Sequence, residues 1–168
     1  QPLPRGLGNP GGPQLDRLAR NGNPKAYKFP RPMINEEHDD FSFSGLKTAA
    51  RYFLRDNPSV MASEAQLADV CASVQAAIVD VLVSKTLRAA KRLNRKCVTA
   101  SGGVTCNSGL RSRLIEDCAR KGLILRLAER QLCTDNAGMV GILAARKLSR
   151  QQAGTDYDAE ILPADALA

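Results

Sequence analysis

The sequence predicts an α/β fold, because helical spacing in its first part gives way to alternating strands and helices in its second. Between residues 97 and 149 the order strand, glycine-rich turn, helix, strand, helix makes a βαβα unit. Over about residues 14–93 apolar side chains recur at helical intervals, which predicts a helical insertion. We expect residues 1–150 to form one lobe and residues 151–168 to form a polar tail.

The N-terminal part is divided by turn signals. A Gly/Pro-rich loop over residues 6–13 precedes a predicted helix over residues 14–20. Residues 23–40 then predict a loop, with basic side chains first and acidic ones around His38 afterwards.

Two further helices complete the insertion. Phe41 and Phe43 alternate with serines, which predicts a short strand or an extended entry into a helix over residues 45–55. The longest predicted helix begins at Ser63 and runs toward Leu93, and its basic end complements the negative C-terminal end of the helix dipole.

The βαβα unit follows from a change of period after residue 96. A predicted strand over residues 97–100 leads into a glycine-rich turn, and a helix is predicted over residues 108–121. A second strand is predicted over residues 123–127, and residues 134–136 open a last helix.

The bulk composition is that of an ordinary globular protein, with 43% hydrophobic and 24% charged residues. The net charge of +7 favours an anionic partner such as a nucleotide or nucleic acid, with simple solubility as the alternative. Aromatic residues make up 4% and Trp is absent, which argues against a surface that binds single strands by base stacking. The apolar runs fall short of the roughly 20 residues that span a bilayer, so we expect no membrane partner.

The cysteines and the histidine limit the chemistry. Five cysteines lie far apart without a CxxC pair and the N-terminus lacks the layout of a secretory signal, so we expect reduced thiols and a cytoplasmic protein. The thiols are expected to fill the core rather than to catalyse. His38 is the sole histidine, which excludes a self-contained zinc peptidase of the HExxH type. The chain also begins with Gln1 rather than Met, which predicts a piece of a longer protein.

The turn from Ser101 to Asn107 is the strongest candidate for ligand binding. Glycines there let the backbone approach a ligand closely, and the following helix start offers free N–H groups to an anion. The amide of Asn107 both donates and accepts, so it could contact a base edge or a hydroxyl. The alternative is that Asn107 only caps the helix.

Two weaker candidates flank this turn in the sequence. The glycine pair that ends at Gly12 could lie against a base or ribose, and Asp16 could accept from ribose hydroxyls; a rigid turn with a favourable acid is the alternative. Asp135 could bind a metal, but a single carboxylate does not hold one, and taken alone it is best interpreted as a helix cap.

In this order, these motifs resemble the second half of the bacterial tRNA threonylcarbamoyl transferases, a family formerly described as glycoproteases. Five collinear blocks carry the resemblance: Pro10-Gly11-Gly12-Pro13, Phe29-Pro30-Arg31-Pro32-Met33, Asp40-Phe41-Ser42-Phe43-Ser44-Gly45-Leu46-Lys47-Thr48, Ser101-Gly102-Gly103-Val104 with Asn107, and Cys133-Thr134-Asp135-Asn136. They span residues 10 to about 148.

The resemblance implies a lobe of an actin/Hsp70-like enzyme, with a ribonuclease-H-like core and added helices. The family transfers a threonylcarbamoyl group from its adenylate to the exocyclic amine of the adenosine beside the tRNA anticodon. The resemblance assigns Gly12, Asp16 and Asn107 to adenylate or ATP binding. It assigns Asp135 to a divalent metal, iron or zinc, whose other protein ligands are two histidines of the first lobe.

Two hypotheses remain from the sequence. The first is a C-terminal fragment of the transferase, inactive alone because the first lobe is missing, with tRNA, adenylate and the family's helper subunits as partners. On this hypothesis Lys25, Lys28, Arg31 and Lys47 are weaker candidates for tRNA contact. The second is a non-catalytic lobe that binds nucleotide or pairs with family subunits. On either hypothesis, the isolated lobe is expected to self-associate through an exposed apolar face.

Overall fold

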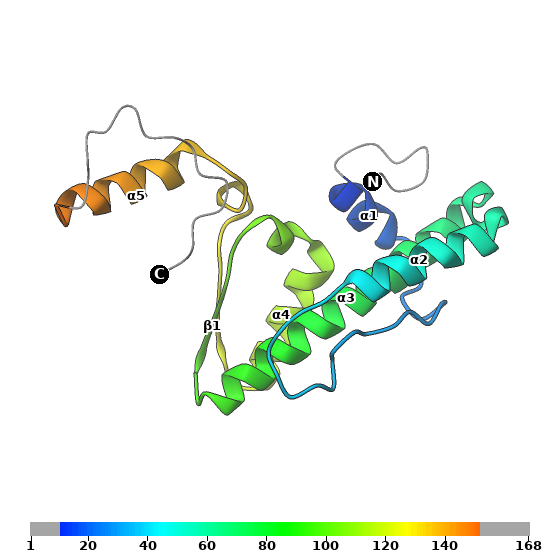
Figure 1. Cartoon of the computed structure of the whole chain (residues 1–168), viewed down its shortest axis with the longest axis horizontal. Helices are drawn as coiled ribbons and strands as arrows, with labels where there is room; N and C mark the ends of the chain where they lie inside the picture. Colours follow the sequence, from blue (N-terminus) through cyan, green and yellow to red (C-terminus); the bar gives the residue numbers. More distant parts are fainter. Residues whose placement is uncertain (1–10, 152–168) are drawn as a thin grey trace. The chain divides into compact units, whose positions relative to one another are not determined.

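The computed structural model describes residues 11–151, which divide into one unit up to Cys133 and another from Thr134 onward. The first unit contains α1 (Gly11–Ala19), α2 (Ser44–Asp56), α3 (Glu64–Arg92), β1 (Cys97–Ala100), α4 (Ser108–Arg120) and β2 (Ile124–Leu127), with short 3-10 turns η1 (Pro58–Ala62), η2 (Gly103–Cys106) and η3 (Arg130–Leu132) (Figure 1). The second unit contains α5 (Ala137–Ser149).

The long helix α3 is the central element of the first unit, and α1 and α4 pack against it (Figure 1). The helix begins where the Ser63 side chain accepts a hydrogen bond from the Gln66 N–H at 3.4 Å. Three hydrophobic clusters share its residues, one with α1, one with α2 and the preceding loop, and one with β1 and α4. A helix covered on several sides has to be apolar nearly all round, and this explains its composition.

This burial corrects one expectation from the sequence. With 29 residues, α3 is long and apolar enough to cross a membrane by length and composition, although no such run was anticipated. Of its most apolar stretch, 56% is buried against the rest of the chain. That coverage is typical of the core helix of a globular protein.

The two strands form a parallel pair joined by α4, as the strand–helix–strand order predicts. Cys97 lies opposite Ile124 at the start of the register, and Ala100 opposite Leu127 at its end. Val98 of β1 packs in one cluster with Leu114 of α4 and with α3. The predicted strand over residues 97–100 is confirmed, and the second begins one residue later than predicted.

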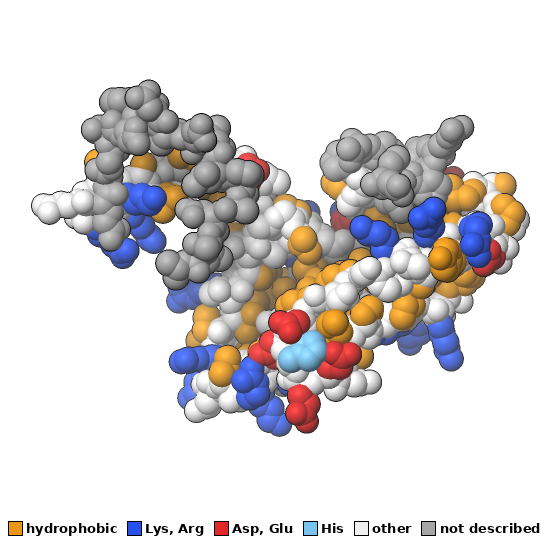
Figure 2. Space-filling view, in the orientation of Figure 1, with side chains coloured by type: hydrophobic (Ala, Val, Ile, Leu, Met, Phe, Trp, Pro, Cys, Tyr) orange, Lys and Arg blue, Asp and Glu red, His pale blue; other side chains and the backbone are white. Residues whose placement is uncertain are grey.

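The basic end of α3 does more than complement the helix dipole. Lys85 is 1% exposed and its Nζ donates to the Met33 carbonyl at 2.9 Å. Arg88 donates to the carbonyls of Ile34 and Glu36, one of them at 2.9 Å. These side chains fasten the 31–40 loop to the helix, and the acidic side chains of that loop gather around the histidine (Figure 2).

Smaller differences from the sequence predictions have local causes. The helix predicted from residue 14 begins at Gly11, with Pro13 in its first turn, where a missing N–H costs little. Residues 41–43 contain no strand, and the backbone at Phe43 is not extended where it leads into α2, with φ −120° and ψ 8°. All five cysteines are free, but Cys97 is exposed and Cys106 is half-buried, so only part of the set fills the core.

Candidate functional site

The glycine-rich turn after β1 is shaped by one positive backbone angle. Gly102 has φ +90°, a conformation that favours glycine. The buried Thr105 ties the turn together, since its Oγ1 donates to the Gly102 carbonyl at 2.7 Å and its N–H donates to the same oxygen at 2.9 Å. Ser101, Gly102 and Gly103 are exposed, so their backbone is open to a ligand.

Asn107 is the N-cap of α4. Its Oδ1 accepts from the Leu110 N–H at 2.9 Å, and its Nδ2 donates to Oε1 of Gln75 on α3 at 2.7 Å. The capping alternative is therefore realised in the structure. An amide has two N–H donors and two lone pairs on its oxygen, so one of each remains for a ligand.

Asp16 is a second cap of the same helix, supplied from α1. Its Oδ1 accepts from the Ser108 N–H at 3.0 Å and from the Ser108 Oγ at 2.7 Å. Its Oδ2 accepts from Arg20 at 3.1 Å, and the residue is 7% exposed. Burial by itself would raise the pKa of Asp16, but the hydrogen bonds from Ser108 and Arg20 together lower the pKa below its ordinary value.

Gly12 lies one helical turn before Asp16, so the two share a face of α1. Gly12 is exposed, and a Cβ added there would meet no atom within 4 Å. The described part of the chain therefore imposes no steric need for glycine at this position.

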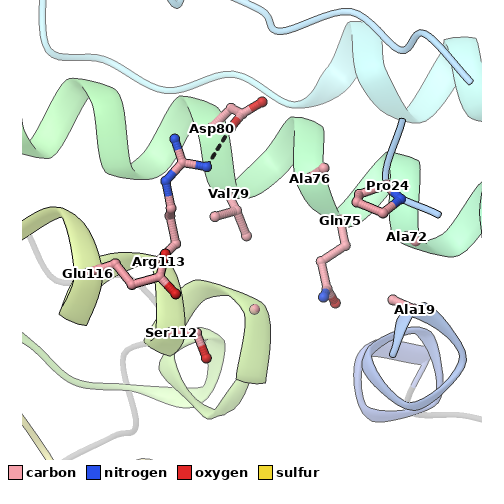
Figure 3. A pocket seen from close by; sticks show the side chains of 11 residues that line it. Ala19, Pro24, Ala72, Gln75, Ala76, Val79, Asp80, Ser112, Arg113 and Glu116 are labelled. Atoms are coloured by element: carbon pink, nitrogen blue, oxygen red, sulfur yellow. Dashed lines mark hydrogen bonds and ion pairs between the residues drawn. The ribbon is translucent and has the colours of Figure 1, made fainter. Parts of the chain in front are cut away.

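A cleft of about 300 Å³ lies between α1, α3 and α4, beside these caps. Figure 3 shows Gln75 pointing toward the space between the helices. Arg113 and Asp80, which also line the cleft, form an ion pair at 3.5 Å. Gly109 lets α4 lie close to the Gln75 side chain of α3, because a Cβ at Gly109 would lie 2.6 Å from Nε2 of Gln75. The side chain that orients Asn107 thus also lines the cleft.

Asp135 belongs to the second unit and is exposed. Its neighbour Asn136 caps α5, with Oδ1 accepting from the Met139 N–H at 3.1 Å and Nδ2 donating to the Thr134 carbonyl at 2.8 Å. The interpretation of Asp135 as the cap is therefore wrong, because the next residue fills that role. This leaves the Asp135 carboxylate outside the capping contacts.

Within residues 11–151 there is no group of three or more His, Cys, Asp or Glu side chains that could hold a metal ion. His38 lies in the acidic loop, where its ring nitrogens pair with Glu36 at 2.5 Å and Asp40 at 3.2 Å. The described residues alone therefore do not make a metal site.

Comparison with known proteins decides the family. Residues 5–142 match the model of the family described as tRNA N6-adenosine threonylcarbamoyltransferase. The chain belongs to this family. A tRNA N6-adenosine threonylcarbamoyltransferase from Geotalea uraniireducens is 44% identical over 165 residues, which cover 97% of this chain and 48% of the relative. One from Bdellovibrio bacteriovorus is 46% identical over 145 residues, covering 86% of this chain and 42% of the relative.

The chain thus spans about half the length of the curated tRNA N6-adenosine threonylcarbamoyltransferases that it matches. The resemblance predicted from the motifs is confirmed. The mixed helix and strand content agrees with an α/β domain of this family.

The structure brings two of the predicted site residues together and adds two that the sequence did not mark. Asp16 and Asn107 meet at the start of α4 through Ser108 and its backbone. Ser108 gave a weak signal as a hydroxyl residue at a helix start, while Gln75 is one polar residue of a long helix and gave none.

Proposed function

We propose that this chain is the C-terminal part of an enzyme that transfers threonylcarbamoyl from threonylcarbamoyl-adenylate to the exocyclic amine of the adenosine next to the tRNA anticodon. Its family and the activity for which its relatives are named support the proposal. Because the chain spans about half of those relatives, it supplies part of the reaction site and is inactive alone. We further propose that its α/β unit belongs to an actin/Hsp70-like lobe with a ribonuclease-H-like core.

The meeting of two predicted site residues at the start of α4 supports a nucleotide site there. Asp16 and Asn107, far apart in the sequence, converge on the first turn of α4. The exposed backbone of Ser101, Gly102 and Gly103 precedes that turn. An exposed glycine backbone and polar side chains with spare hydrogen-bonding capacity suit an adenylate, whereas the N–H groups of Ser108 and Leu110 at the start of α4 are already bonded to Asp16 and Asn107.

The hydrogen bonds of Asp16 and Asn107 support different roles for the two residues. A carboxylate has about four lone-pair positions, and three of those of Asp16 are already occupied by Ser108 and Arg20. Asp16 therefore mainly holds α1 against α4, with one lone pair left for a ribose hydroxyl. Asn107 is half-buried and offers the freer contact, and Gln75 fixes its amide in one orientation.

The metal belongs to the proposal only in part. Asp135 is proposed to give one carboxylate to an iron or zinc ion, which would help neutralise the charge of the adenylate phosphate. The remaining ligands, two histidines by resemblance, would come from the part of the enzyme outside this chain. A single exposed carboxylate fits that role, since it is kept outside the capping contacts of α5.

The proposed partners are tRNA, an adenylate or ATP, and the family's helper subunits in the cytoplasm. Lys25, Lys28 and Lys47 are exposed and available to phosphates. Arg31 is a poorer candidate, because its guanidinium pairs with Asp80 at 3.0 Å. Exposed apolar residues of α5, including Met139, favour self-association of the isolated chain.

A chimeric enzyme tests this function directly. The aligned part of the Geotalea uraniireducens enzyme is replaced by this chain, and transfer of threonylcarbamoyl to tRNA is measured with the family's helper subunits present. We expect transfer by the chimera and loss of transfer when Asp135→Ala is introduced. A chimera that is folded and soluble but transfers nothing would contradict the proposal.

A further inference from the structure

Two thiols lie together at the end of the small sheet. Because β1 and β2 are parallel and paired, the turns that follow them, η2 and η3, emerge at the same edge. Cys106 is the last residue of η2, and Cys133 follows η3. The sheet therefore brings the two cysteines together although they are far apart in the sequence.

Several contacts fix this approach. The Cys133 Sγ lies 3.3 Å from Oγ1 of Thr105, the residue that precedes Cys106. One carbonyl, that of Arg130, accepts from both cysteines, from the Cys106 Sγ at 3.7 Å and from the Cys133 N–H at 3.1 Å. The Cys133 thiol also donates to the Glu129 carbonyl at 3.2 Å.

The other three cysteines have different surroundings. Cys71 is buried in the cluster between α1 and α3, and Cys118 in the cluster between α3 and α4. Cys97 is exposed at the start of β1, the opposite end of the strand from the paired turns. Cys106 is half-buried, so a soluble reagent reaches it, while Cys133 lies buried beside it.

We propose that Cys106 and Cys133 are a redox-active pair that closes into a reversible disulfide. With glutathione disulfide as the oxidant, the Cys106 sulfur attacks one glutathione sulfur, forms a mixed disulfide and releases one glutathione thiol. The Cys133 sulfur then attacks the Cys106 sulfur and releases the second glutathione as a thiol. The two cysteines lose two electrons and two protons, and the glutathione disulfide gains both.

The bond would join η2 to η3 across the end of the sheet. Cys106 immediately precedes the cap residue Asn107, so the crosslink also restrains the glycine-rich turn and the start of α4. Closing a loop of about 28 residues constrains the unfolded chain, and the oxidised form is expected to melt at a higher temperature than the reduced form.

Disulfide mapping across a series of glutathione buffers tests the pair. The 168-residue chain is equilibrated with reduced and oxidised glutathione, trapped with an alkylating reagent and digested for mass spectrometry. We expect the Cys106–Cys133 disulfide to form at a low ratio of oxidised to reduced glutathione. Any other cysteine pair should require a ratio at least about tenfold higher. In guanidinium chloride, where the fold is lost, this preference should disappear.

Two variants sharpen the result. Cys106→Ser should abolish the low-ratio disulfide, while Cys97→Ser, which removes an exposed thiol outside the pair, should leave it unchanged. Circular dichroism checks the fold of each variant, and mapping of the unmodified chain decides the matter even if a variant does not fold. The proposal is overturned if Cys97 bonds first, or if the folded chain shows no preference among its cysteine pairs.

Discussion

The residues predicted to bind a ligand differ between the two units in whether they also form structural hydrogen bonds. At the start of α4, Asp16 and Asn107 hold the helix in place through hydrogen bonds of 2.7–3.0 Å. In the second unit, Asn136 caps α5 and the adjacent Asp135 is exposed, with no side-chain hydrogen bond among residues 11–151. The first pair serves structure and any ligand together, whereas Asp135 is free of that structural duty.

This difference determines what mutations can reveal. A substitution at the start of α4 changes stability and binding at once, so a lost activity there does not identify a contact. A substitution at Asp135 changes only what an external partner would sense. The two units therefore call for different experiments.

Asp16→Ala should give the largest loss. It removes acceptors for Ser108 and Arg20 and leaves the first N–H of α4 without its partner. We expect the free energy of unfolding to fall by about 2–3 kcal/mol, measured by urea denaturation of the chain. A loss within about 0.5 kcal/mol would mean that these contacts do not hold α1 to α4.

The same carboxylate predicts how stability depends on pH. Its pKa in the folded protein is lowered, net, by the hydrogen bonds from Ser108 and Arg20 that outweigh burial. Its contribution is therefore complete above its ordinary value of about 3.8 and is lost as the pH falls through the lower folded value. Asp16→Asn should flatten the stability profile below about pH 4. Parallel profiles for the variant and the unmodified chain would argue against this role.

Asn107→Ala should cost less stability, about 1 kcal/mol for a lost helix cap, and should also weaken ATP binding. Asn107→Ser separates the two effects, because serine keeps a capping oxygen but has no amide. We expect the serine variant to melt close to the unmodified chain and yet, in the chimeric enzyme, to bind ATP less tightly by calorimetric titration. If the serine variant binds ATP normally, the amide is a cap and not a ligand contact.

The sequence predicted the elements of this region but not how they meet. The strand at residues 97–100 and the helix from residue 108 follow from local periodicity and turn residues. The contact between Asp16 and Ser108 joins residues 92 positions apart and depends on how α1 docks on α3 and α4. Local patterns contain no information on such docking.

The basic end of α3 shows a second limit. The sequence presents Lys85 and Arg88 as part of a cationic helix end, where exposure is the ordinary expectation. In the structure they turn toward carbonyls of the 31–40 loop. The pairing of a helix with an irregular loop leaves no periodic signal, because a loop's free carbonyls are not encoded by its side chains.

Asn136→Ala should have a smaller and local effect. Asn136 is half-buried and its capping bond lies at the surface, so the loss of the cap is expected to cost about 0.5–1 kcal/mol of helix stability and to fray the first turn of α5. The Met139 N–H donates to the Asn136 side chain, so fraying would appear as faster amide hydrogen exchange at Met139. Protection of α4 should be unchanged, and exchange that rises equally in both helices would mean that the cap contributes to global stability.

Asp135→Ala should have the smallest effect on the chain itself, within about 0.5 kcal/mol, because the side chain is exposed and outside the capping contacts. In the chimeric enzyme the same change should abolish stoichiometric iron or zinc, measured by elemental analysis. Asp135→Asn is the matched control, since it keeps the size of the side chain and removes its charge. Unchanged stability together with lost metal would identify Asp135 as a metal ligand that has no part in stabilising the chain. Full metal content in both variants would remove Asp135 from the metal site and leave the α4 junction as this chain's contribution.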